Sequence, residues 1–173
     1  MDAVNQVAEF ATTGAANAWV WAGNFLVLLI FTVIMILFSY KAGRGGIISL
    51  IVSFYIGYAL YLVFPYTNWA LDMVGDNVIL KGLVSLILFG LASFFPFIFV
   101  QRLVGGGFGV LSFVPRFALS FLSACFLLAL GYHVFHVSNI YTFPEPINTL
   151  FAPDHFFFWW FIAPLIGLFF LVH

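Results

Sequence analysis

The sequence predicts an all-α integral membrane protein, a polytopic helical bundle with five transmembrane helices in a single domain, residues 1–173. Hydrophobic residues make up 65% of the chain and charged residues 6%, whereas a soluble domain is about half apolar and a quarter charged. The apolar residues gather in runs close to the ~20 residues that a helix needs to cross a bilayer. The few charges fall mostly between those runs. The lipid bilayer is therefore the first partner that the chain is expected to have.

Each apolar run predicts one span, and the runs are separated by short polar segments. The predicted spans are residues 18–40, 47–64, 82–100, 117–137 and 156–172. The fifth span is short and carries Pro164 near its middle, which a membrane helix tolerates when neighbouring groups satisfy the freed carbonyl. The longest connection is the outer loop 138–155, which contains three prolines. We expect it to fold back over the bundle as a short cap.

The basic residues predict the orientation of the bundle. Four of the five fall in alternate connections, which makes Lys41, Arg44, Arg102 and Arg116 cytoplasmic anchors. The N-terminus is then outside and the C-terminus cytoplasmic. The first 17 residues contain no Lys or Arg, so they do not resemble a secretory signal, which begins with positive charge. Arg116 is expected at the inner headgroups; the alternative is that it converges with Arg44 and Arg102 on a cytoplasmic cavity.

Two stretches resemble a known family. In "YKAGRGGIISLIVSFYIGY" a span ends in a basic, glycine-containing turn and a small, serine-bearing span follows. In "QRLVGGGFGVLSFVPRFALSFLSA" a glycine-rich loop precedes an arginine that opens a span. Over roughly residues 20 to 137 the chain resembles the bacterial colicin V production (CvpA) family of small inner-membrane proteins. The resemblance implies a bacterial inner-membrane location and a role in envelope physiology or export, and it supplies no catalytic residues.

Small residues predict where helices approach one another closely. Gly45, Ser49, Ser53 and Gly57 recur every four residues and so share one face of the second span. Ser120 and Ala124 offer a similar surface on the fourth span. Small residues let helix backbones come together in lipid, where packing rather than the hydrophobic effect holds helices to each other. The seam is expected inside this bundle; the alternative is self-association through an exposed face.

Three tyrosines form a second feature of the second span. Tyr55, Tyr58 and Tyr61 are three residues apart, on a different arc from the small residues. A phenol hydroxyl inside a membrane needs a polar partner. Hydrogen bonds between helices meet that need in the simplest interpretation. The alternative is a polar path for a solute.

Histidines gather near the outer face. His133 and His136 share a helix face, and Asp154 and His155 precede the fifth span. Imidazoles with a carboxylate are ligands for Zn²⁺ or groups for proton relay, although such residues are also common at the membrane interface. Because the sequence has neither an H-E-x-x-H pattern nor thiolate ligands, we expect no metal and no cofactor.

The remaining motifs argue against several functions. The net charge of −1 argues against nucleic acid as a partner, and "GGGFG" lacks the Lys-Ser/Thr of a phosphate-binding loop. We therefore expect a non-enzymatic protein of the CvpA-like type that supports export or envelope homeostasis through helix–helix assembly, as a homo-oligomer or with a larger membrane-protein partner. The alternatives are a small channel or carrier lined by the tyrosines, and a structural subunit of a larger complex.

Overall fold

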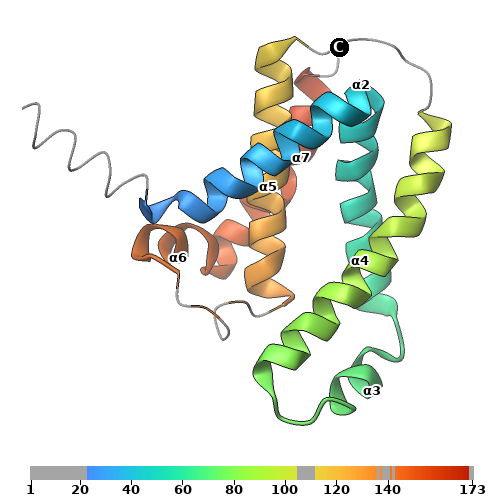
Figure 1. Cartoon of the computed structure of the whole chain (residues 1–173), viewed down its shortest axis with the longest axis vertical. Coiled ribbons are helices and arrows are strands. Elements are labelled where there is room, and N and C mark those ends of the chain that lie inside the picture. Colours follow the sequence, from blue (N-terminus) through green and yellow to red (C-terminus); the bar gives the residue numbers. More distant parts are fainter. Residues whose placement is uncertain (1–22, 105–111, 136, 138–140, 142, 172–173) are drawn as a thin grey trace, which may run out of the picture.

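The computed structural model describes residues 23–104, 112–135, 137, 141 and 143–171, and within them all regular structure is helical. The helices are α2 (Leu26–Val63), α3 (Thr67–Asp72), α4 (Val78–Leu103), α5 (Phe113–His133), α6 (Glu145–Phe151) and α7 (Asp154–Leu171) (Figure 1). Four of these helices, α2, α4, α5 and α7, are long and apolar enough to cross a membrane. The prediction of an all-α membrane bundle is therefore confirmed.

Helix α2 contains residues 26–40 of the first predicted span and residues 47–63 of the second. Its continuity is broken at Gly43, where φ is 71° and ψ is −169°. Glycine has no Cβ to clash at positive φ, so it allows a break one residue long where the sequence predicted a short loop. Figure 1 shows the first half of α2 running obliquely across the bundle and the second half turning back beside α4. The bend is tight, because a Cβ added at Gly46 would lie 2.2 Å from the Cβ of Ala42.

The other long helices begin at recognisable signals. The Asn77 side chain caps α4, accepting hydrogen bonds from the backbone N–H groups of Ile79 (3.1 Å) and Leu80 (3.3 Å). This cap starts the helix at Val78, ahead of the apolar run that predicted a span from residue 82. Helix α5 begins at Phe113 and ends at His133, so it lies a turn earlier in the chain than the range 117–137.

Two short helices lie in the connections between the long ones. Helix α3 follows α2, and α6 lies within the connection from α5 to α7. The last carbonyls of α6 receive partners from the long helices: Trp160 Nε1 donates to the Leu150 carbonyl at 2.9 Å, and His133 Nε2 lies 3.1 Å from the Phe151 carbonyl. These contacts hold α6 against the ends of α5 and α7, as a cap would require.

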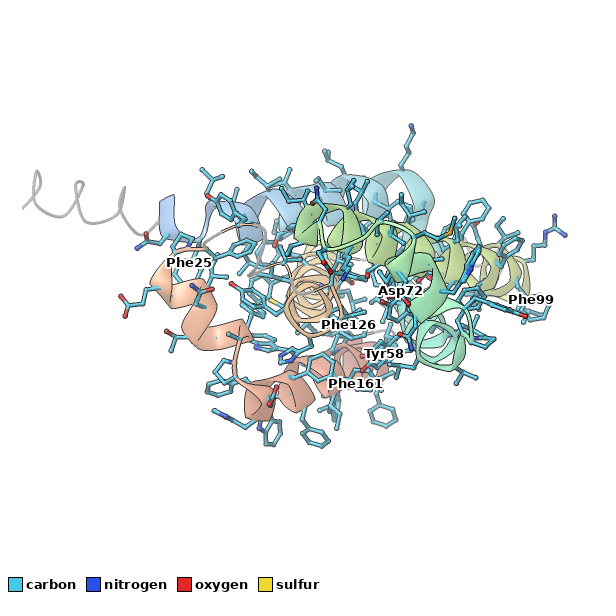
Figure 2. All side chains as sticks on the ribbon, turned by 90° about the horizontal axis from the view of Figure 1, so that it is seen from below. Phe25, Tyr58, Asp72, Phe99, Phe126 and Phe161 are labelled. Carbon is cyan, nitrogen blue, oxygen red and sulfur yellow. The ribbon has the colours of Figure 1, made fainter. Side chains whose placement is uncertain are left out.

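Helix α5 is at the centre of the bundle. It packs against both α2 and α7, while α4 packs mainly against α2. Leu119, Ala124, Cys125, Phe126 and Leu130 on α5 are fully buried. In Figure 2, viewed from the end where α3 lies, Phe126, Tyr58 and Phe161 lie together in the middle of the molecule, and Phe99 of α4 lies at the periphery. The outward face of α4 is apolar and exposed, as a lipid-facing surface is.

Candidate functional site

A cavity of about 460 Å³ lies where α2 ends, α3 passes, α4 begins and α5 ends. This size is within the range of small-molecule sites. Its polar lining residues come from four elements and are Tyr58, Tyr61, Thr67, Asn68, Lys81, Ser85 and His133. Its apolar lining includes Leu62, Leu71, Val78, Val134 and Phe135. The cavity therefore combines polar groups with apolar walls.

Two of the three predicted tyrosines line this cavity. The Tyr58 ring contacts Phe157 and Phe161 of α7, and the Tyr61 ring contacts Phe135 at the end of α5. These aromatic contacts fix the rings edge to face. Within the described part of the chain, no hydrogen-bond partner is found for the hydroxyls of Tyr58, Tyr61 or Ser85. Three hydroxyls near one cavity are thus available to a solute or to water.

Tyr55 occupies a different environment from the other two tyrosines. Its hydroxyl donates a hydrogen bond to the Phe161 carbonyl of α7. Its ring stacks on Phe126 of α5, with the ring centroids 4.6 Å apart and the planes at 22°. One turn of helix separates Tyr55 from Tyr58, so this packed group lies deeper in the bundle than the cavity. The tyrosines therefore divide into two that line the cavity and one that bonds helix to helix.

Lys81 is the cationic side chain of the cavity lining. Its Nζ lies 3.6 Å from Asp76 Oδ1, and the Asp76 side chain is fully exposed. An ion pair of this exposure contributes little, because water and salt screen it. Among the described residues that line the cavity there is no Asp or Glu. The carboxylates nearest to the lining, Asp76 beside Lys81 and Asp154 beside His133, both belong to exposed side chains.

His133 joins the cavity wall to α6 and α7. Its Nδ1 lies 3.4 Å from Asp154 Oδ1 and its Nε2 lies 3.1 Å from the Phe151 carbonyl. Its ring lies 4.4 Å from the Phe157 ring. Both ring nitrogens thus face acceptors, and only the doubly protonated imidazolium can donate to both. His133 therefore connects the end of α5 to the end of α6 and the start of α7.

The predicted metal candidates come together only in part. His133 and Asp154 are paired, whereas His155 is exposed and packs on Phe156, and His136 lies outside the described residues. Nowhere in the described ranges do three or more His, Cys, Asp or Glu side chains group in a way that could hold a metal ion. The His133–Asp154 pair therefore holds helices together rather than forming a recognisable ligand set.

The small residues lie between helices. Ser49, Ser53, Gly57, Ser120 and Ala124 are buried, and Gly45 is partly buried. Gly57 faces α4 so closely that an added Cβ would lie 2.0 Å from Ser93 Oγ and 2.8 Å from Ser93 Cα. The backbones of α2 and α4 can approach this far only because position 57 has no side chain.

The four predicted basic anchors belong to the kink of α2, the last turn of α4 and the first turn of α5, which lie at one end of the bundle (Figure 1). Lys41 and Arg102 are exposed. Arg116 lies with its Cζ 4.1 Å from the centroid of the Tyr40 ring, a cation–π contact. The Arg116 Nε atom is enclosed and has no hydrogen-bond partner among the described residues. Arg116 thus attaches the start of α5 to α2.

Sequence reasoning did not identify several residues of the cavity. Lys81 could have been identified from the sequence, because it is the one basic residue in the connections that hold the acidic residues. Thr67, Asn68 and Ser85 gave no such signal, because their role depends on how α3 and α4 cross the end of α2. No family model, no curated protein and no solved structure matches this chain.

Proposed function

We propose that this chain is a non-enzymatic integral membrane protein that takes a small polar solute from the outer side into the cavity between α2, α3, α4 and α5. The observation that carries the proposal is the convergence on one cavity, which Lys81 also lines, of three hydroxyls that have no hydrogen-bond partner among the described residues, those of Tyr58, Tyr61 and Ser85. A polar group inside a membrane protein is costly unless something satisfies it, and so it commonly marks a solute path.

The proposed topology has five crossings, with the N-terminus outside and the C-terminus cytoplasmic. The break at Gly43 supports it, because the two halves of α2 can each make one crossing. The basic residues at the kink of α2 and in the facing turns of α4 and α5 would then be cytoplasmic, in agreement with the positive-inside rule. In a bacterial cell this membrane is the inner one.

The proposed mode of action is that of a carrier, or of a channel that opens on a signal. The support for it lies beneath the cavity, where the Tyr55, Phe126 and Phe161 rings are in mutual contact. A solute in the cavity would have to displace these rings to move further between α2, α5 and α7. Movement of α7 at Pro164 is the simplest way to separate them, because a proline interrupts the hydrogen bonds of its helix.

Thiol labelling in native membranes tests the proposal. The single native cysteine, Cys125, is buried and is first replaced by alanine. Tyr58→Cys should react with a membrane-impermeant maleimide added from outside, and Ser53→Cys should react slowly or not at all. Leu60→Cys, on the exposed apolar side of the same helix, is the matched control and should stay unlabelled in lipid. Absence of reaction at position 58 would exclude an aqueous cavity.

A second candidate function is helix–helix assembly, as a homo-oligomer or with a larger membrane protein, in export or envelope homeostasis of the CvpA-like type. The one-sided packing of α4 favours it, because Gly90 on that helix has open space around it. Gly90 would allow another helix to approach closely. Native mass spectrometry of the protein in lipid nanodiscs tests this candidate: a particle containing one chain alone would exclude it.

A further inference from the structure

The composition of the cavity lining narrows the class of solute. Lys81 contributes a positive charge, which the fully exposed Asp76 opposes only weakly from 3.6 Å, and no Asp or Glu is among the described residues of the lining. Val78, in the first turn of α4, also borders the cavity, and the start of a helix carries a partial positive charge. These groups favour an anion over a cation.

The neutral polar groups agree with this preference. The hydroxyls of Tyr58, Tyr61 and Ser85 can each donate a hydrogen bond, and the Asn68 side chain carries two further donor hydrogens. Charge-assisted hydrogen bonds to a carboxylate are stronger than those between neutral groups. The cavity thus presents the Lys81 ammonium group, weakly paired with Asp76, and several neutral donors.

The apolar walls restrict the anion further. The two tyrosine rings, Phe135 and several aliphatic side chains make up much of the lining. A small, fully hydrated inorganic anion would leave those walls without contacts. An anion with an apolar body would cover them, which is favourable by about 25 cal/mol per Å² of apolar surface removed from water.

We infer that the cavity binds a small organic monoanion, a carboxylate or similar acid group on an apolar body, with Lys81 as its counter-charge. This inference rests on the proposed function and specifies its solute. The bound acid group replaces Asp76 as the partner of Lys81, since that pair is exposed and 3.6 Å long. The same chemistry is found in free carboxylates and in the acidic headgroups of lipids, so the test must separate the two.

The experiment measures binding of three isosteres to the full chain in phosphatidylcholine nanodiscs by saturation-transfer NMR, with empty nanodiscs as blank. Benzoate, benzamide and benzylamine share one aromatic body and carry charges of opposite sign or none. Benzoate should bind most tightly. Lys81→Gln should weaken benzoate binding roughly tenfold and leave benzamide almost unchanged. Lys81→Arg should retain most of the affinity, and Lys41→Gln, at the far end of the bundle, should have no effect.

A variant that binds benzoate more tightly cannot be explained by damage to the fold, so it tests the inference independently of Lys81→Gln. Asp76→Asn removes the competing carboxylate from a fully exposed position, and it should tighten benzoate binding roughly twofold. Repeating the titration with phosphatidylglycerol in the nanodisc identifies the source. Unchanged affinity indicates a dissolved anion, and competition indicates a lipid headgroup; both support an anion site.

The inference is overturned if Lys81→Gln leaves benzoate affinity unchanged, or if benzylamine binds as tightly as benzoate. Such a result leaves the proposed function intact when the Tyr58→Cys thiol still reacts from outside, because the cavity would then be aqueous but take a different solute. If the Tyr58→Cys thiol does not react from outside, the proposed function itself is contradicted.

Discussion

The second half of α2 contacts its neighbours through two faces that are held in different ways. Toward α4 the contact is made by Gly57, which has no side chain and lies directly against Ser93. Toward α5 and α7 the contact is made by Tyr55, whose ring stacks on Phe126 and whose hydroxyl bonds to the Phe161 carbonyl. The contact with α4 is possible because glycine has no side chain. The contact with α5 and α7 is made by aromatic rings and one hydrogen bond.

This difference explains where the cavity lies. Close packing brings α4 against α2 at Gly57, but α4 then crosses α2 at an angle, and its first turns diverge from it (Figure 1). The tyrosines after position 57 keep α5 and α7 at the distance of an aromatic ring. Space therefore opens beyond the crossing, and the residues that face it become the lining of the cavity.

The largest expected effect comes from filling the close contact. Gly57→Ala places a Cβ 2.8 Å from Ser93 Cα, so a backbone must move. We expect a loss of about 2–3 kcal/mol in the free energy of unfolding, within the range for overpacking. SDS-induced unfolding in mixed micelles measures it. Gly90→Ala, where an added Cβ meets nothing within 4 Å, is the control and should cost nothing.

A smaller effect is expected at the aromatic face. Tyr55→Phe keeps the ring and removes the hydroxyl that bonds the Phe161 carbonyl, so the free energy of unfolding should fall by about 1–2 kcal/mol. Tyr58→Phe, whose hydroxyl has no partner among the described residues, should leave stability unchanged. A cost at Tyr58 as large as that at Tyr55 would contradict this explanation, because the ring contacts and not the hydrogen bond would then set the stability.

The smallest effect should have the opposite sign. Ser93 Oγ is enclosed and has no hydrogen-bond partner among the described residues, so Ser93→Ala removes an unsatisfied polar atom. We expect the same unfolding assay to register a gain of up to about 1 kcal/mol. Removing the Tyr55 hydroxyl would then weaken the contact of α2 with α7, whereas removing the Ser93 hydroxyl would strengthen its contact with α4. A loss at Ser93 as large as that at Tyr55 would mean that both faces depend on hydrogen bonds.

The sequence predicted the features that arise from local patterns. Long apolar runs predicted the long helices, since the bilayer requires both their length and their composition. A glycine within a basic stretch marked the reversal at Gly43, although a longer loop was expected there. The proline-rich connection was expected to form a cap, and α6 lies in it.

The rest depends on contacts between distant residues. Tyr55 and Phe161 are 106 residues apart, and nothing local to either indicates their pairing. The cavity depends on where α3 and the start of α4 lie relative to α2, which the pairing of Gly57 with Ser93 determines. The three tyrosines were equivalent by spacing, and only the packing of α7 against Tyr55 distinguishes that residue from the two that line the cavity.

The central claim is that one side of the outer half of α2 faces water and the other faces lipid. Power-saturation EPR on single spin labels at positions 56, 58 and 60 tests it in liposomes. The label at Tyr58 should be relaxed mainly by a water-soluble nickel complex. The labels at Ile56 and Leu60, both exposed and apolar, should be relaxed mainly by oxygen dissolved in the lipid. Preference for oxygen at all three positions would contradict the claim, because the cavity would then be closed to water.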